Sequence, residues 1–150
     1  LLSRLPFFPL YYNGDTKFIP IHCSDLTDII YEIIKKEVHS KIIECVGPEE
    51  ISLKDIIKKL LKLIGKDKIL LPMPLFLANI SAKFFQLFPK PLLTIDQLKL
   101  LKHNNIPSGK YKTNFEIGVP STRFFEEEVK KYCYMWREEG KFSTEKYKKI

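Results

Sequence analysis

The sequence predicts an α/β fold in which short strands alternate with amphipathic helices. Several stretches carry apolar residues at the three- and four-residue spacing of a helix, and short apolar runs bounded by turn residues separate them. Hydrophobic residues make up 45% of the 150 residues and charged residues 29%. These proportions are typical of globular proteins and argue against a disordered chain. The length fits one domain or a piece of a larger protein.

The N-terminal stretch predicts a turn followed by one short strand. Residues 1–12 are apolar but broken by prolines, and Asn13, Gly14 and Asp15 form a strong turn signal. The run KFIPIH, residues 17–22, predicts a short strand. Its proline cannot donate a ladder hydrogen bond, so we expect the strand at a sheet edge or in an irregular pairing.

The following stretch predicts an amphipathic helix. Ser24 or Asp25 can serve as its N-cap, because their side-chain oxygens accept hydrogen bonds from the free amides of the first turn. Asp25 and Asp28 also lie where acidic groups offset the positive end of the helix dipole. Apolar residues follow at a spacing of three, four, seven and eight and define one face: Leu26, Ile29, Ile30, Ile33 and Ile34.

A second strand and helix repeat this pattern. Residues 41–47, KIIECVG, predict a short buried strand. Ser52 and Asp55 resemble a capping box with Asp in place of the usual Glu, and Gly65 suits the position just after the helix. Residues 68–74 predict another short extended segment. The helix predicted between Ser52 and Gly65 has an apolar stripe that consists of Leu53, Ile56, Ile57, Leu60 and Ile64.

Residues 74–88 are the most apolar segment of the chain. Pro74 suits the first turn of a helix. The segment has about 15 residues and contains Lys83, which makes it too short to span a bilayer. It is apolar on nearly all sides, as expected for a helix that is buried or docked on another surface. A core or domain-interface helix is the favoured interpretation, and a helix lying on a membrane is the alternative.

A capping box predicts the next helix. Thr94 and Gln97 stand at the spacing of this motif, and the helix is expected to reach about residue 103 with Leu98 and Leu101 facing inward. Residues 104–121 then form a long loop rich in turn residues.

Ser121 is the expected N-cap of a last helix. The basic tail over residues 141–150 is expected to fray. The helix is predicted to place its large apolar residues on one side: Phe124, Phe125, Val129, Tyr132 and Trp136.

Four chemically capable side chains gather within seven positions. His22, Cys23, Asp25 and Asp28 are all types that bind metals or transfer protons. Their position at a strand end and in a capped first helical turn accounts for these residue types without a metal-binding or catalytic site. We therefore predict that they bind no metal. The three histidines, at 22, 39 and 103, lie in different elements and form no HxxxH or HExxH motif.

The cysteines favour a reducing compartment. Cys23, Cys45 and Cys133 are odd in number, far apart in sequence, and form no CxxC pair. This spacing argues against a disulfide framework and against a zinc site.

One motif in the chain matches a catalytic pattern. Tyr31 and Lys35 fit Tyr-x-x-x-Lys, in which the lysine lowers the pKa of the tyrosine so that the phenol can exchange a proton with substrate. However, no Gly-x-Gly-x-x-Gly or phosphate-binding loop precedes it, because the six glycines are dispersed along the chain. We therefore interpret the pair as a chance match, and we assign no catalytic, cofactor-binding or metal-binding residue.

The net charge and the N-terminal sequence give only weak information about binding partners. The net charge is +7, from 25 Lys and Arg against 18 Asp and Glu. Only Arg4, Arg123 and Arg137 are arginines, so bidentate phosphate recognition is not indicated and no nucleic-acid partner is expected. No signal peptide is visible, and the start at Leu1 suggests a piece cut from a longer protein.

The ordered set of segments resembles a known family. The set comprises FIPIHCSDLTDIIYEII, KIIECVGPEEISLKDIIKKLLKLIG, LLPMPLFLANISAKFFQLFPKPLLTIDQLKLL and FEIGVPSTRFFEEEVKKY. It is similar to the C-terminal half of extended short-chain dehydrogenases of the NAD-dependent epimerase/dehydratase family. It most resembles the atypical branch with the nucleotide-binding accessory subunit of respiratory complex I and its bacterial relatives.

The resemblance implies the end of a Rossmann half over residues 1–25 and a C-terminal lobe facing substrate or partner over residues 26–150. The glycine-rich half, which would bind NAD or NADP, and the true Tyr-x-x-x-Lys would lie upstream. Phe18 stands where sugar-nucleotide epimerases often carry arginine, which argues against a nucleotide-sugar substrate.

Two functions follow from the resemblance. The first is NAD(P) binding in a structural or assembly role. The alternative is an NAD(P)-dependent oxidoreductase or epimerase with a small or lipid-like substrate. The expected partners are the protein's own N-terminal Rossmann half and either complex I or a peripheral membrane surface. The expected location is the cytoplasm or the inner face of the respiratory membrane.

Overall fold

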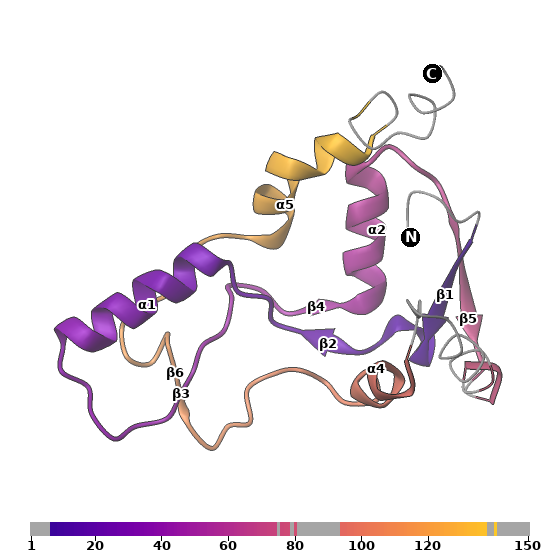
Figure 1. The fold of residues 1–150 in the computed structure, drawn as a ribbon. Helices are drawn as coiled ribbons and strands as arrows, with labels where there is room; N and C mark the ends of the chain where they lie inside the picture. Colours follow the sequence, from indigo (N-terminus) through magenta and orange to yellow (C-terminus); the bar gives the residue numbers. More distant parts are fainter. Residues whose placement is uncertain (1–6, 75, 79, 81–93, 138–139, 141–150) are drawn as a thin grey trace. The chain divides into compact units, whose positions relative to one another are not determined.

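The computed structural model of the chain has a mixed α/β architecture of short strands and helices (Figure 1). This architecture confirms the α/β class that the alternation of apolar runs predicts. The structure describes residues 7–74, 76–78, 80, 94–137 and 140.

The chain forms two compact units, each built from separate stretches of sequence. The predicted division at residue 25 concerns the place of the chain within a longer protein, and it stays a prediction. Unit 1 consists of Leu1–Lys17, Ser52–Asn104 and Cys133–Ile150, and unit 2 of Phe18–Ile51 and Asn105–Tyr132.

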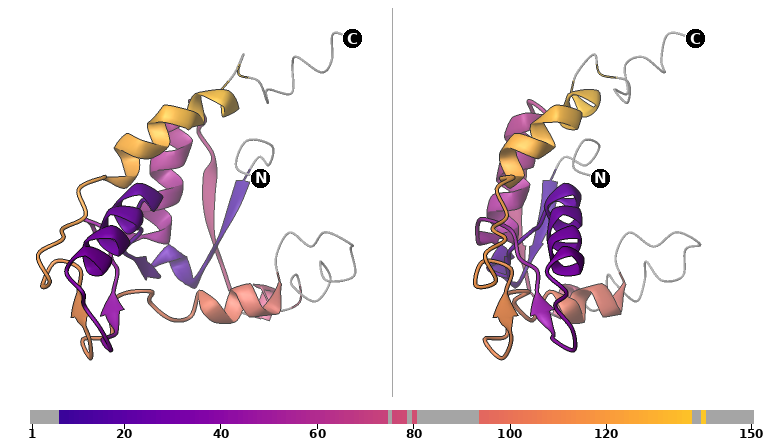
Figure 2. Two further views of the ribbon diagram at one scale, coloured as in Figure 1. Left: turned by 60° about the vertical axis from the view of Figure 1, so that its left-hand side comes forward. Right: turned by 90° about the vertical axis from the view of Figure 1, so that its left-hand side faces the viewer.

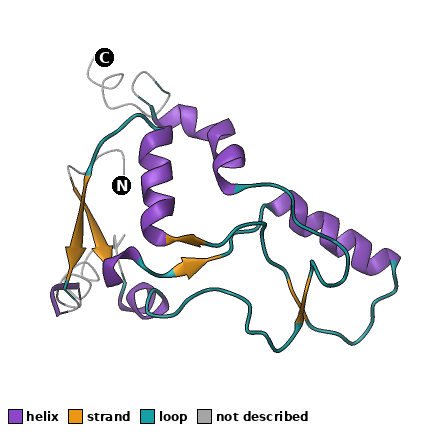
Figure 3. Cartoon of the chain, turned by 180° about the vertical axis from the view of Figure 1, so that it is seen from behind, coloured by secondary structure: helices purple, strands orange, loops and turns teal. Residues whose placement is uncertain are grey.

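Unit 1 contains a two-stranded parallel sheet. In it β1 (Phe7–Tyr11) pairs with β5 (Ile69–Met73), and the two strands lie together in Figure 3. β5 confirms the extended segment predicted over residues 68–74. β1 was not predicted, because its central Pro9 is a residue that usually argues against a strand.

A tight turn, η1 (Tyr12–Gly14), follows β1 where the sequence predicts one. Asn13 and Gly14 both have positive φ, at 56° and 75°, a conformation that these two residue types tolerate best. A Cβ on Gly14 would lie 2.8 Å from the Cβ of Lys54. Glycine therefore allows the turn to pack directly on the start of the next helix of unit 1.

That helix, α2 (Leu53–Leu63), is capped at both ends as predicted. The Ser52 hydroxyl accepts a hydrogen bond from the Asp55 amide at 3.1 Å and donates one to the Asp55 carboxylate at 2.7 Å. Beyond the C-terminal end, Gly65 has a φ of +67°. The amides of Gly65 and Lys66 donate to carbonyls of the last turn, which is the Schellman arrangement.

The buried side of α2 is wider than the predicted stripe. Ile57 and Ile64 are buried as expected, but Leu61 and Leu63 are buried as well. The buried sector of α2 is therefore wider than a single line of residues.

The helix α4 (Ile95–Leu100) has the complete predicted capping box. Thr94 accepts a hydrogen bond from the Gln97 amide, and the Gln97 side chain accepts one from the Thr94 amide. Leu98 is buried as predicted. The helix ends at residue 100 rather than near 103, where the chain continues as turns.

A buried apolar cluster joins three elements of unit 1. It contains Tyr11 of β1, Leu98 of α4 and Ala78. Ala78 belongs to the segment predicted as a helix over residues 74–88. Its described residues past position 75 are helical, but residues 81–88 of that prediction lie outside the described residues.

The strand predicted over residues 17–22 is only partly present. It is reduced to β2 (Lys17–Phe18). Beyond it the backbone is held by Gly47, whose amide donates to the Ile19 carbonyl at 3.5 Å. Pro20 has no amide to extend a ladder, so the prediction of a strand through residue 22 was wrong.

The strand predicted over residues 41–47 is also shorter than expected. It is reduced to β3 (Ile43–Glu44), which pairs in parallel with β6 (Lys112–Thr113). The two lie side by side in both views of Figure 2. β6 falls within the predicted loop over residues 104–121, and β4 (Ile51–Ser52) directly precedes α2.

Unit 2 contains α1 (Cys23–Lys35). Its N-cap is His22, so the prediction of Ser24 or Asp25 as the cap was wrong. The helix begins at residue 23, which places both of those residues inside its first turn. Ile29 of the predicted apolar face is buried, whereas two members are exposed: Ile30 and Ile34.

The last helix, α5 (Phe125–Cys133), continues into η2 (Tyr134–Trp136). The amide of Phe125 donates to the Glu49 carboxylate at 3.1 Å, whereas the Ser121 hydroxyl donates to the Val46 carbonyl. The prediction of Ser121 as the N-cap was therefore wrong. On the predicted apolar side only Val129 is buried, and three members are exposed: Phe124, Tyr132 and Trp136. The predicted frayed tail lies outside the described residues.

Candidate functional site

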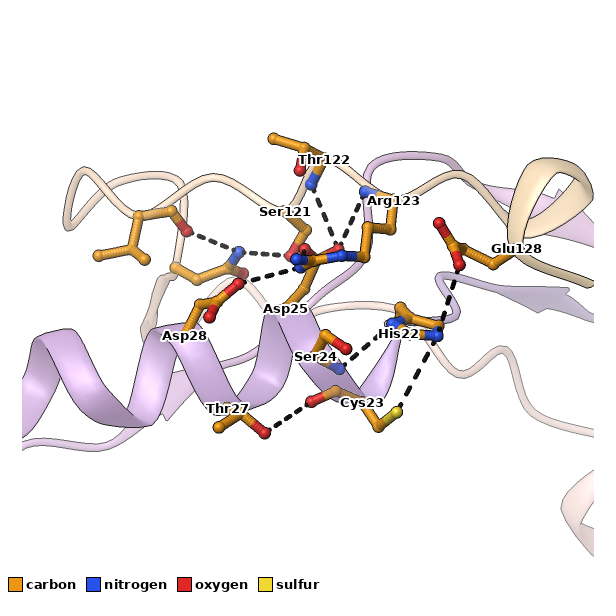
Figure 4. A network of polar contacts seen from close by, with 12 residues as sticks. His22, Cys23, Ser24, Asp25, Thr27, Asp28, Ser121, Thr122, Arg123 and Glu128 are labelled. Atoms are coloured by element: carbon orange, nitrogen blue, oxygen red, sulfur yellow. Dashed lines mark hydrogen bonds and ion pairs between the residues drawn. The ribbon is translucent and has the colours of Figure 1, made fainter. Parts of the chain in front are cut away.

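A network of polar contacts surrounds the start of α1 in unit 2 (Figure 4). It contains all four side chains that the sequence presents as candidate ligands or acids. It also contains residues from a segment almost a hundred positions later in the chain.

Asp25 is the centre of this network. Its side chain is buried, although an ionised carboxylate needs partners to be buried without a large cost. One carboxylate oxygen accepts hydrogen bonds from the backbone amides of Thr122 and Arg123 at 3.2 and 3.0 Å. The other accepts a hydrogen bond from the Arg123 guanidinium. The carboxylate is therefore satisfied from both sides by one short segment.

Arg123 bridges two carboxylates of α1. Its Nη1 contacts Asp25 and lies 3.0 Å from Oδ2 of Asp28. Hydrogen bonds to Asp28 and then to Asp25 raise the pKa of the guanidinium further above its usual range. Asp28 is largely exposed, so its half of the bridge is solvated. We call Asp25, Asp28, Thr122 and Arg123 the Asp25–Arg123 cluster.

A second buried contact holds the adjoining loop in place. Asn114 is fully buried, accepts a hydrogen bond from the Val46 amide at 2.8 Å, and donates to the Val119 carbonyl and the Ser121 hydroxyl. Ser121 in turn donates to the Val46 carbonyl at 2.8 Å. Every polar atom of the Asn114 amide group has a partner, which is what a buried amide requires.

His22 has a ring orientation set by the helix start. Its Nδ1 accepts a hydrogen bond from the Ser24 amide at 3.2 Å, so in the neutral ring the proton is on Nε2. Nε2 lies 3.8 Å from the Glu128 carboxylate and 4.0 Å from the Cys23 sulfur. A hydrogen bond from Lys131, followed by its charge and those of His22 and Arg123, lowers the pKa of Glu128.

This arrangement does not suit nucleophilic catalysis. A base that activates a thiol must accept its proton on the facing nitrogen. In the neutral tautomer Nε2 of His22 carries a proton and faces both Cys23 and Glu128. The cluster therefore lacks the ordered chain of nucleophile, base and orienting acid that such catalysis needs.

The same residues are poorly arranged for a metal. Asp25 and Asp28 direct oxygens at Arg123, and the His22 nitrogens face the Ser24 amide and Glu128. Within the described ranges, no three His, Cys, Asp or Glu side chains stand close enough together to hold a metal ion.

Tyr31 and Lys35 lie on one face of α1, as their spacing requires. The Lys35 Nζ is 5.9 Å from the centre of the Tyr31 ring, and it also lies 3.7 Å from Glu32. Tyr31 is 64% exposed. This is the geometry of a solvated cation–π contact on a helix surface.

Two carboxylates, one in β3 and one after β6, accept hydrogen bonds from backbone amides. The two oxygens of Glu44 accept hydrogen bonds from the Ser108 amide at 3.0 and 3.1 Å, and hydrogen bonds from Ser108 lower the pKa of Glu44. Glu116 accepts a hydrogen bond from the Thr113 amide at 2.7 Å, which lowers the pKa of Glu116.

The described glycines do not fit a dinucleotide pyrophosphate. In such a site, glycines after a strand let the backbone approach the phosphates at a helix start. Here Gly14 packs on Lys54, and Gly47 packs so closely on Pro20 that an added Cβ would lie 1.8 Å from its carbonyl oxygen. These two glycines allow close packing within the fold.

Arg123, Ser121, Asn114 and Glu128 were not assigned to a site from the sequence. Each contacts a residue 68 to 106 positions away in the chain, so no local pattern predicts these contacts. The rarity of arginine in the chain was a signal for Arg123.

No described helix combines the length and apolarity required to cross a bilayer.

Comparison with protein-family models finds no match to this chain, and comparison with curated proteins finds none either. The fold and the site together define a mixed α/β protein with a buried carboxylate–guanidinium cluster.

Proposed function

We propose that this chain is the C-terminal segment of an NAD(P)-binding protein of the complex I accessory-subunit type. Its role is structural or assembly-related, at the inner face of the respiratory membrane. The nucleotide is held by a glycine-rich Rossmann half, and the present residues form the end of that half and the lobe that follows it.

The parallel pairing of β1 and β5 is the observation that carries this proposal. Parallel strands require a long crossover connection and occur almost only in sheets covered on both faces. Here the sheet has two strands, and three of its apolar side chains are substantially exposed: Phe7, Ile69 and Leu71. Such a pair supports a larger parallel sheet completed by a Rossmann half.

The polar network supports a binding role over a catalytic one for this lobe. The oxygens of Asp25 are occupied by Thr122 and Arg123, and the neutral His22 ring presents a proton to Cys23. These contacts stabilise the connection between segments distant in sequence. They leave no described acid–base pair aimed at a substrate.

The alternative is an NAD(P)-dependent oxidoreductase or epimerase with a lipid-like substrate. It is favoured by Phe76 and Ile80, which are 64% and 61% exposed in the apolar segment after β5. Side chains of this kind could form the apolar wall of a substrate pocket.

Nucleotide titration of the 150-residue chain tests the proposal. Calorimetry with NADH and with NADPH should show no binding at micromolar concentrations, because the pyrophosphate cradle is not among these residues. A longer chain that includes the preceding half should bind one of the two. Micromolar binding by the 150 residues alone would overturn the proposal.

The sequence encoded upstream of Leu1 separates the two functions. A glycine-rich loop without Tyr-x-x-x-Lys supports the structural role, and the same loop with that motif supports the enzyme. An upstream sequence with neither motif contradicts both.

A further inference from the structure

Positive charge is concentrated in one of the two units. Unit 1 contains 17 Lys and Arg residues against seven Asp and Glu, a net charge of +10. Unit 2 contains eight against eleven, a net charge of −3. A general preference for lysine in the sequence would enrich both units, so the asymmetry requires a cause specific to unit 1.

Three of these 17 basic residues lie on the solvent-facing side of α2. Lys54, Lys58 and Lys62 are exposed and follow one another at four-residue spacing, which places them in a row along one face. The opposite side of α2 is buried in the core of unit 1. The row adjoins two further lysines: Lys59 and Lys66.

This row is not neutralised within the fold. Among the residues that the structure describes, none of Lys54, Lys58 and Lys62 takes part in an ion pair. The nearby acid Asp55 accepts a hydrogen bond from Ser52 at the helix start. Like charges four residues apart destabilise a helix slightly, so the row opposes folding unless an anionic partner offsets it.

We propose that the lysine row of α2, formed by Lys54, Lys58 and Lys62, is a docking surface for an anionic phospholipid membrane. Lysines near such a surface are attracted to its negative potential, and the attraction falls off within a Debye length. Residues at four-residue spacing lie on neighbouring positions of one helix face, so a flat anionic surface can approach all three lysines together. The inference does not rest on the proposed nucleotide-binding role.

Lipid fits unit 1 better than nucleic acid does. Arginine is the type best suited to phosphate recognition. The described arginine of unit 1, Arg137, is engaged within that unit, where its side chain donates to the Leu63 carbonyl at 2.7 Å. Unit 1 also exposes Phe76. An apolar side chain of this kind adds to binding at the lipid interface but has no electrostatic use on a phosphate backbone.

Vesicle flotation of the 150-residue chain tests the proposal. The chain should float with vesicles that contain phosphatidylserine and stay behind with pure phosphatidylcholine. Binding should be strong at about 0.1 M salt and largely lost near 1 M, where the Debye length falls to about 3 Å. The variant K54Q/K58Q/K62Q should bind on the order of 100-fold more weakly, since each lysine near the surface contributes about fivefold.

The matched control is K41Q/K110Q/K130Q, which removes three exposed lysines from unit 2. Its net charge equals that of the K54Q/K58Q/K62Q variant. It should bind like the unaltered chain. Gln and Lys have similar helix propensities, and circular dichroism checks that α2 persists.

The charge-preserving variant K54R/K58R/K62R should also retain binding, and it keeps the test valid if the Gln variant unfolds. Equal losses in the α2 and control variants, or equal binding to neutral vesicles, would overturn the proposal. Tighter binding to an oligonucleotide than to anionic vesicles would overturn it as well.

Discussion

Replacing Asp25 by alanine should be among the most destabilising single changes in unit 2. The substitution removes an acceptor of two backbone amides and one guanidinium, and it leaves Arg123 with only its exposed partner Asp28. Removing one member of a fully buried pair typically costs about 3–5 kcal/mol. Because the Arg123 side chain is 34% exposed, we expect the low end of this range, about 3 kcal/mol. That is about a fifth or more of the stability of a typical domain, which is about 5–15 kcal/mol.

Urea denaturation followed by circular dichroism measures this loss. With a denaturant dependence of about 1–3 kcal/mol per molar urea, the midpoint should fall by about 2 M. Asp28→Ala is the matched control, because Asp28 lies on the same helix and contacts the same Nη1 but is 63% exposed. It should cost no more than about 1 kcal/mol. Equal losses in the two variants would refute the argument that burial makes Asp25 the essential member of the Asp25–Arg123 cluster.

Three further predictions test other contacts. Gly47→Ala should destabilise the protein by about 3 kcal/mol or more, because its Cβ would collide with the Pro20 carbonyl; thermal unfolding measures the loss. The carboxyl of Glu44, whose pKa is lowered by hydrogen bonds from Ser108, should contribute stability at pH values above the ordinary pKa of a glutamate and lose it as the pH falls through its own lowered pKa; NMR titration and acid unfolding measure this change. Cys133, whose pKa is raised by burial, should be alkylated by iodoacetamide more slowly than the exposed Cys23; mass spectrometry resolves the order.

Each of these predictions has a contrary outcome. Gly65→Ala, in open space at positive φ, should cost only about 1–2 kcal/mol, and a loss as large at residue 65 as at 47 contradicts the steric argument. Glu44→Gln should flatten the acid limb of the stability profile, and an unchanged limb contradicts the assigned hydrogen bonds. Alkylation of Cys133 ahead of Cys23 contradicts its burial.

The helix caps show what the sequence determined by itself. Ser52 with Asp55, and Thr94 with Gln97, form the contacts that their spacing predicts, and Gly65 ends α2 where expected. These contacts join residues three positions apart or require one backbone conformation, so neighbouring residues are sufficient to specify them. The mixed α/β class follows from the same local periodicity, which also located α1 and α2 to within a few residues.

Tertiary structure determined which hydrogen-bond partners the polar residues around α1 have. Asp25 was one of two residues expected to cap α1, but it is buried because two amides and a guanidinium, 97 and 98 positions away, satisfy its charge. Ser121 was expected to cap α5, but its hydroxyl donates to the Val46 carbonyl, and the Glu49 carboxylate accepts the Phe125 amide instead. Whether a polar side chain caps its own helix or bonds a distant segment depends on which unsatisfied groups folding brings beside it, and the local sequence carries no record of those groups.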